Sequence, residues 1–229
     1  MSALSSSRPR PPQAPLFSPR ATTVYRVLLG AAALLLATTG SMAYAYYHSS
    51  YWNRVGMAPG QPILFSHRHH AAELRIDCRN CHSTVEDSAF AGMPSTRTCL
   101  MCHSQIFTDT TMIQPLVESA ALNVPLQWNW VNRLPSHVFF NHGIHVRKGV
   151  ACTTCHGEVG KMALMVKGES LTMRWCLDCH RDPGPRLSPP ADIFAAVSSG
   201  AQPGGTRSDL AGFYRVKTGA LTDCTTCHH

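Results

Sequence analysis

Five short cysteine–histidine motifs constrain this chain more than any other feature of its sequence. Each reads Cys-x-x-Cys-His, and the copies occupy residues 78–82, 99–103, 152–156, 176–180 and 224–228. All 10 cysteines of the 229-residue chain fall inside these copies. Zinc sites or disulfides would have no use for a histidine after every cysteine pair, whereas this motif is the attachment signal of a c-type haem.

The spacing within the motif has a physical reason. Two thiols about one helical turn apart can both form thioethers with one haem, and the next histidine is then held as the proximal ligand of the iron. We therefore predict five c-type haems. The attachment residues are Cys78, Cys81, Cys99, Cys102, Cys152, Cys155, Cys176, Cys179, Cys224 and Cys227, and the proximal ligands are His82, His103, His156, His180 and His228.

A second histidine pattern predicts the distal ligands of four irons. Phe-x-His-x-x-His occurs at residues 65–70 and again at 140–145, shortly before a haem motif each time. Histidines three apart on a helix project from one face, and each iron has only one free axial position. Each pair must therefore serve two haems. The predicted distal ligands are His67, His70, His142 and His145.

These motifs repeat along the chain with nearly constant spacing. His67 and His142 are 75 residues apart, and Cys78 and Cys152 are 74 residues apart. Two similar di-haem units are therefore expected, at residues 49–110 and 111–182, followed by a Pro- and Gly-rich linker with the terminal haem at residues 183–229. Because five haems would supply much of the apolar core, we predict a mainly helical and irregular fold with little or no β-sheet.

The fifth iron has no distal ligand in this repeat, since residues 212–223 contain no histidine. The candidates are His137, Met162, Met165 and Met173, and a methionine is preferred at this stage. A methionine ligand would raise the reduction potential relative to two histidines. We expect the haem at Cys224 to lie at an edge of the array, on the side where electrons leave.

An uncharged run of 21 residues, 27–47, is long enough to span a bilayer as a helix. Arginines precede it, and no acidic residue occurs before Glu73, so the positive-inside rule predicts a cytoplasmic N-terminus. We predict a basic, Pro-rich tail at residues 1–23 and a signal anchor at 24–48 in the inner membrane, with the haem domain in the periplasm, where such haems are attached. A cleaved signal peptide is the alternative.

The net charge of +7 does not indicate a nucleic-acid partner. Four arginines lie in the predicted cytoplasmic end, which leaves 16 basic against 13 acidic side chains outside. Ionised haem propionates would make that outer domain negative. We expect no nucleic-acid binding.

The order of these elements resembles one family. A single anchor, "FSHRHH", two haem motifs, "LPSHVFFNHGIHV", "LTMRWCLDCHRDP" and a terminal "LTDCTTCHH" are similar to the pentahaem cytochrome c subunit of alternative complex III, a bacterial membrane quinol:electron-acceptor oxidoreductase. The resemblance covers residues 22–229 and departs in the long linker and the basic tail. The di-haem units also resemble small multihaem cytochromes of the c3/c7 type.

This resemblance implies an electron-transfer subunit that makes no bonds itself. It implies three kinds of partner: an iron–sulfur subunit, a polysulfide-reductase-like membrane subunit that oxidises quinol, and a monohaem cytochrome c or other periplasmic acceptor. Two other functions stay open. A multihaem nitrite or hydroxylamine reductase would need an open iron, and a self-sufficient membrane-anchored quinol dehydrogenase would need a quinol site, for which the apolar run offers no charged residue.

Overall fold

The computed structural model describes residues 18–198 and 207–228, with the backbone alone for residues 207–209. Most of the predicted basic tail, residues 1–17, and residues 199–206 of the predicted linker lie outside the described residues. The chain divides into two compact units, one ending at Trp52 and the other beginning at Asn53.

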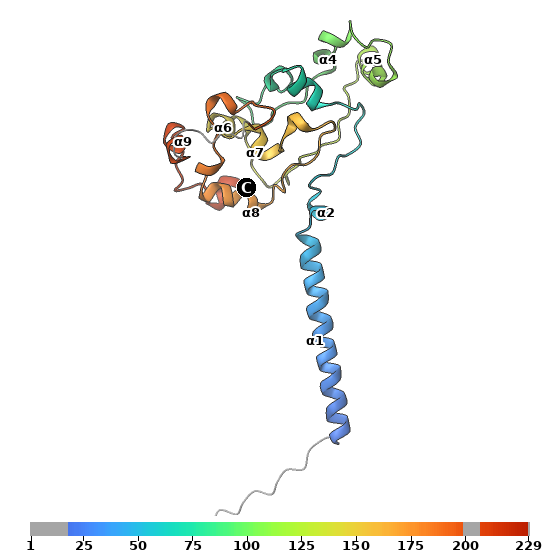
Figure 1. The fold of residues 1–229 in the computed structure, drawn as a ribbon, viewed down its shortest axis with the longest axis vertical. Helices are drawn as coiled ribbons and strands as arrows, with labels where there is room; N and C mark the ends of the chain where they lie inside the picture. Colours follow the sequence, from blue (N-terminus) through green and yellow to red (C-terminus); the bar gives the residue numbers. More distant parts are fainter. Residues whose placement is uncertain (1–17, 199–206, 229) are drawn as a thin grey trace, which may run out of the picture. The chain divides into compact units, whose positions relative to one another are not determined.

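One long helix, α1 (Pro19–Tyr47), makes up most of the first unit (Figure 1). The Ser18 hydroxyl accepts a hydrogen bond from the N–H of Ala21, and Pro19 already has the φ angle of a helix, so the helix begins here. At 1.5 Å per residue it is about 43 Å long. With a mean hydropathy of 1.7 over its most apolar window and no buried side chain, α1 is long and apolar enough to cross a membrane.

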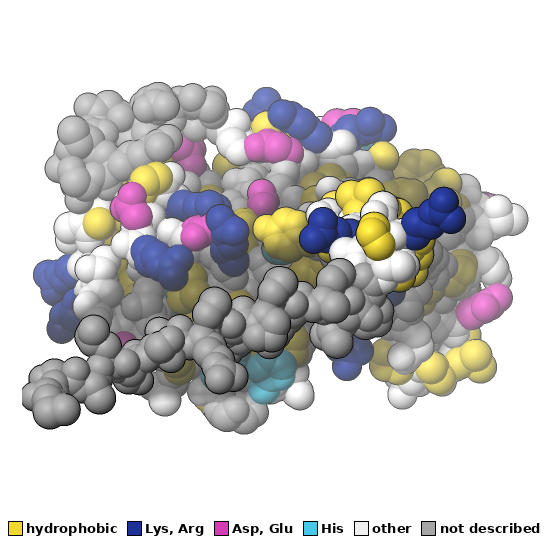
Figure 2. All heavy atoms as spheres, turned by 90° about the horizontal axis from the view of Figure 1, so that it is seen from below, with side chains coloured by type: hydrophobic (Ala, Val, Ile, Leu, Met, Phe, Trp, Pro, Cys, Tyr) yellow, Lys and Arg dark blue, Asp and Glu magenta, His cyan; other side chains and the backbone are white. Residues whose placement is uncertain are grey.

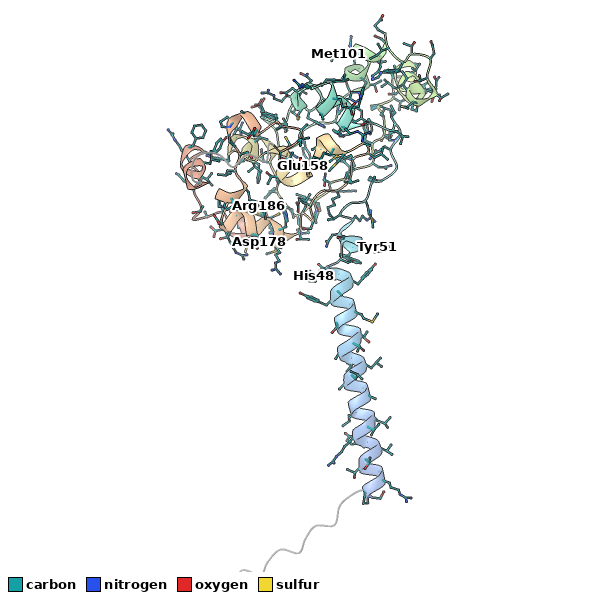
Figure 3. The ribbon with its side chains drawn as sticks, in the orientation of Figure 1. His48, Tyr51, Met101, Glu158, Asp178 and Arg186 are labelled. Atoms are coloured by element: carbon teal, nitrogen blue, oxygen red, sulfur yellow. The ribbon has the colours of Figure 1, made fainter. Side chains whose placement is uncertain are left out.

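Aromatic side chains gather where α1 ends. The rings of Tyr46 and Tyr47 lie 5.5 and 5.6 Å from the ring of Trp52, on the one-turn helix α2 (Ser50–Asn53). His48 and Tyr51 lie in the same region (Figure 3). Amphipathic rings at one end of an apolar helix are typical of a membrane–water interface.

Short helices joined by loops build the second unit. The haem motifs lie on α3 (Cys78–Cys81), α4 (Thr96–His103), α7 (Cys152–His156), α8 (Met173–Arg181) and α10 (Cys224–Cys227). The distal pairs lie on η1 (Arg68–Glu73), a π-helix that His67 precedes, and on α6 (His142–Arg147). The other elements are η2 (Thr111–Ile113), α5 (Gln114–Leu122), η3 (Val159–Lys161), η4 (Gly184–Arg186), η5 (Pro190–Asp192) and α9 (Arg207–Phe213).

The described residues form no strand, only isolated bridges such as the one between Val150 and Leu187. The predicted helical and irregular fold with little or no sheet is therefore confirmed.

Capping explains where some helices start. Ser95 caps α4 and Thr172 caps α8, and each hydroxyl accepts a hydrogen bond from the backbone N–H three residues later.

Few apolar side chains are buried in this unit. One cluster joins Val85, Val146 and Ile193, with Phe194 and Tyr214 among the side chains packed against it. Among the residues that the structure describes, the buried hydrophobic residues number seven. That core is small for a unit of this size, and it agrees with the expectation that haems complete the interior.

Residues 187–198, which we call the strap, follow the second haem-motif pair along the chain. The carbonyl of Ile193 accepts a hydrogen bond from the N–H of Cys152 (3.1 Å). The carbonyl of Ala196 accepts one from the N–H of Gly160 (2.7 Å). This part of the predicted linker therefore packs against a haem motif.

The surface carries charges of both signs. In Figure 2, Lys and Arg side chains are interspersed with Asp and Glu side chains across the face in view. Two examples are the pairs of Arg79 with Asp77 (2.9 Å) and of Arg147 with Asp87 (3.5 Å). Neighbouring charges on this unit thus partly neutralise one another.

Candidate haem-binding sites

The two predicted distal pairs have nearly the same local geometry. The ring of Phe65 lies 4.9 Å from that of His67 at 88° and 4.4 Å from that of His70 at 28°. Around Phe140 the corresponding values are 4.8 Å at 89° and 4.6 Å at 27°. One pair lies on a π-helix and the other on an α-helix, yet the imidazoles are held alike. The sequence repeat is therefore also a structural repeat.

A hydrogen bond fixes the second histidine of each pair. Nδ1 of His70 bonds the carbonyl of Ser66 (2.9 Å), and Nδ1 of His145 bonds the carbonyl of Asn141 (2.8 Å). Because a carbonyl only accepts, each Nδ1 carries the hydrogen and Nε2 keeps its lone pair. That neutral tautomer is the one that can bind a metal through Nε2.

Distal and proximal histidines face each other at the spacing that an iron requires. A metal bound about 2 Å from one nitrogen of each ring separates the ring centres by about 6 Å. The donor sets therefore fit a haem iron held by two imidazoles. The ring centres are 6.3 Å apart for His142 with His156, 6.1 Å for His145 with His180 and 6.2 Å for His70 with His103.

His67 and His82 form a further pair beside the first of these. Burial, and then the neighbouring His82, lowers the pKa of His67 to about 4. Burial, then His142, His82 and His67, lowers the pKa of His156 to about 4. These imidazoles are neutral at pH 7, as metal ligands must be. The His67–His82 and His142–His156 pairs consequently lie next to each other.

The last motif has a histidine partner as well. The ring of His137 lies near that of His228, with 5.6 Å between the ring centres and 20° between the ring planes. The N–H of Phe139 donates to the carbonyl of Cys227 (2.7 Å), which holds this segment along the motif. The structure thus places His137 where the missing distal ligand is needed.

The methionine candidates have other surroundings. The side chain of Met173 is 65% exposed. Met162 lies beside Gly157, and its carbonyl accepts a hydrogen bond from the N–H of Arg68 (3.0 Å). Met165 is half-buried. The placement of His137 favours this residue over the methionines that the sequence suggested, because spacing along the chain did not reveal that residues 137–139 lie along the last motif.

Neighbouring sulfurs reveal which sites adjoin. The neighbouring Cys152 lowers the pKa of the Cys78 thiol to about 7, so these two thiols lie close together. Burial, then Cys78 and Cys102, raises the pKa of Cys81. The motif at 78–82 therefore lies near the motifs at 99–103 and 152–156.

The same reasoning extends the row. Burial, then Cys179 and Cys176, raises the pKa of Cys155 to about 12. Burial, then Cys227, raises the pKa of Cys176. The sites therefore follow one another as 99–103, 78–82, 152–156, 176–180 and 224–228, with the first two exchanged relative to chain order. At the first end of the row, Met101 is 71% exposed (Figure 3).

The two repeats meet through equivalent residues. The N–H of Arg68 donates to the carbonyl of Met162, and the N–H of Gly143 donates to the carbonyl of Ser88, both at 3.0 Å. Arg68 corresponds to Gly143, and Ser88 to Met162, in the 74–75-residue repeat. The two bonds are therefore exchanged by a local two-fold relation, as in an isologous dimer contact.

Sequence analysis missed the residues that hold the outer nitrogens of the ligands. Gly92, with φ +81°, presents its carbonyl to Nδ1 of His82 (2.7 Å). The side chain of Asn132 contacts Nδ1 of His156 (2.9 Å). A glycine ten residues after a proximal histidine is a faint signal for a left-handed turn, and nothing in the sequence marks Asn132.

Comparisons with known proteins agree with this arrangement. Residues 138–229 match the family described as cytochrome c7 and related cytochrome c. Over 97 residues, or 42% of this chain, the sequence is 37% identical to the menaquinone reductase, multiheme cytochrome c subunit, of Nitratidesulfovibrio vulgaris. The match spans 45% of that relative's length. The cytochrome c7-like fold class and a c-type haem cofactor are therefore confirmed.

Proposed function

We propose that this chain is the electron-transfer subunit of a membrane quinol:electron-acceptor oxidoreductase, of the alternative complex III type, and that it holds five c-type haems. The observation that carries the proposal is the row of five attachment motifs, each with a second histidine near its proximal histidine. The name of the N. vulgaris relative, a menaquinone reductase subunit, supports a quinol-linked complex.

Each haem would be held by two cysteines and two histidines of the chain. When bound, a haem supplies a centre that gains or loses one electron. Two imidazoles would hold each iron from both sides, and where a carbonyl accepts from Nδ1 it fixes the tautomer of that ring, so no position would stay open for a substrate. The proposed axial pairs, in the order of the row, are His70–His103, His67–His82, His142–His156, His145–His180 and His137–His228.

The proposed partners extend from the resemblance and from the relative's name. α1 would anchor the chain in the inner membrane with its N-terminus in the cytoplasm and residues 49–229 in the periplasm. An iron–sulfur subunit and a polysulfide-reductase-like membrane subunit would supply electrons taken from quinol. A monohaem cytochrome c or another periplasmic protein would accept them.

The test uses the full-length protein with its haems attached. We expect about five haems per chain by pyridine haemochrome assay and only low-spin signals by electron paramagnetic resonance. His137→Ala should convert one haem to high spin, while the control Met165→Leu should leave all spectra unchanged. A high-spin haem in the native protein would favour a multihaem enzyme. Menaquinol oxidation by the purified chain alone would favour a self-sufficient dehydrogenase.

A further inference from the structure

Hydrogen bonds on the outer nitrogens of the ligand imidazoles differ between the two di-haem units. We propose that this difference gives the haems at Cys152 and Cys176 lower reduction potentials than those at Cys78 and Cys99, and that Asn132 tunes the haem at Cys152. The inference rests on the proposed function, through the ligand pairs assigned there.

In the second unit, every ligand imidazole has a partner at Nδ1. Three of the partners are backbone carbonyls and the fourth is a side chain. The contacts are His142 to Ala89 O at 2.8 Å, His145 to Asn141 O at 2.8 Å, His180 to Leu221 O at 2.8 Å and His156 to the Asn132 amide at 2.9 Å.

In the first unit, only one ligand of each haem has such a partner. Nδ1 of His82 bonds Gly92 O (2.7 Å), and Nδ1 of His70 bonds Ser66 O (2.9 Å). Nδ1 of His67 and Nδ1 of His103 are buried and have no hydrogen-bond partner among the described residues. His67 is the repeat equivalent of His142, so the local two-fold relation is broken at this bond.

The consequence for the iron follows from ligand basicity. An Nδ1–H that donates to a carbonyl makes the imidazole a stronger electron donor through Nε2. A stronger donor stabilises the oxidised iron more than the reduced iron, which lowers the reduction potential. All eight imidazoles of the two di-haem units are half-buried, so the hydrogen bonds are compared between ligands of the same burial class.

Asn132 can be changed without altering the backbone. Its Nδ2 faces Nδ1 of His156, while its Oδ1 is buried and has no partner among the described residues. If Nε2 of His156 binds iron, Nδ1 carries a hydrogen and needs an acceptor. Turning the amide over places Oδ1 there, and amide oxygen and nitrogen have nearly the same shape. Asn132 then accepts a hydrogen bond from the proximal ligand of the Cys152 haem.

The position of this haem in the row makes its potential important. The sites at Cys99 and Cys78 lie on one side of it and those at Cys176 and Cys224 on the other. With the second unit poised lower, the haems of the first unit become reduced first. Among these four haems, electrons then collect in the first di-haem unit, which lies toward the Cys99 end of the row.

The experiment is a potentiometric titration of the full-length, haem-loaded protein, followed by electron paramagnetic resonance and visible spectra. Asn132→Leu removes the acceptor, and Asn132→Asp replaces it with a stronger one. We expect the first variant to raise the potential of one haem and the second to lower it, with the other four unchanged. Asn129→Leu is the matched control, because Asn129 is exposed and bonds Gly60 and Gln61 instead of a histidine.

Distal variants assign the potentials to sites. His67→Ala, His70→Ala, His142→Ala and His145→Ala should each remove one low-spin signal and so identify one titration. The proposal is wrong if the second-unit haems titrate at or above those of the first unit, or if both Asn132 variants leave every potential unchanged.

A separate measurement keeps the proposed function distinct. If His156→Ala produces no high-spin haem, the ligand pairs and the proposed function fail together. If it does produce one while the Asn132 variants have no effect, only the tuning fails. Should Asn132→Leu load fewer haems than the native chain, Asn132→Asp and the order of the native potentials still decide.

Discussion

At the scale of single residues, paired imidazoles decide what this protein can do. Burial lowers the pKa of His67 and of His156 to about 4, so both rings are neutral at pH 7. A neutral imidazole can bind a metal through its lone pair. Two such rings about 6 Å apart leave room for one iron and for no substrate. These residues therefore favour electron transfer over bond-making chemistry.

The three-residue spacing of the distal pairs leads to a prediction at this scale. His142→Ala and His145→Ala should each convert one haem to high spin, and the two variants should affect different haems, since the two rings face His156 and His180 respectively. Redox titration with spectral resolution measures this. Ile144→Ala is the control, because Ile144 lies between the two histidines in the sequence and is 52% exposed. Loss of the same haem in both variants would contradict the assignment.

At the scale of elements, very short helices are held by contacts made elsewhere in the chain. Helices of four or five residues such as α3 and α7 are unstable alone. The hydrogen bonds of a single turn do not offset the conformational entropy lost when a helix nucleates. α6 meets the first di-haem unit through the hydrogen bond from the N–H of Gly143 to the carbonyl of Ser88. The strap meets α7 through the hydrogen bond from the N–H of Cys152 to the carbonyl of Ile193. Attached haems add further cross-links between these helices and the rest of the unit.

The contact of α6 with the first unit can be weakened by one methyl group. A Cβ at position 143 would lie 2.6 Å from the carbonyl oxygen of Glu86, which is backbone and cannot easily move away. Gly143→Ala should therefore destabilise the unit by about 1–3 kcal/mol, as overpacking does. The midpoint of thermal unfolding of the haem-loaded protein measures it.

Gly212→Ala on α9 is the matched control for this substitution. A Cβ at position 212 meets nothing within 4 Å. There the change should be neutral or stabilise the helix by up to about 1 kcal/mol, because alanine is the better helix former. Equal midpoints for the two variants would show that the two units do not meet at Gly143.

At the scale of the whole molecule, an apolar helix is joined to a unit that holds redox cofactors. The long helix α1 has no buried side chain, and the compact unit that begins at Asn53 has a small protein core. A bilayer around α1, and haems within the compact unit that begins at Asn53, would supply the apolar surroundings that each lacks.

Anchoring by α1 gives a prediction for the full-length chain. Native protein should stay in the membrane fraction after an alkaline carbonate wash. Leu35→Arg, in the middle of α1, should release a large fraction, because a charge at the bilayer centre costs about 2.5–3.5 kcal/mol. Leu74→Arg is the control, since Leu74 is an exposed residue outside α1, in the compact unit that begins at Asn53. Equal retention of both variants would argue against a membrane-spanning α1.

The sequence alone determined the chemistry of this chain. Covalent attachment and axial ligation depend on which residues stand two or three positions apart, so the motifs at residues 78–82 and 140–145 predict a haem cofactor and its ligands without a fold. The apolar run at 27–47 predicts the long helix in the same way, because a bilayer-spanning segment is a matter of length and composition.

Tertiary structure decided the arrangement of those sites. The exchange of the first two motifs in the row, the placement of His137 beside His228, and the contact of Asn132 with His156 all join residues far apart in the chain. No local spacing encodes such contacts. They form because the two repeats meet through a shared surface and the chain then returns, after the strap, to bring its last motif against residues 137–139.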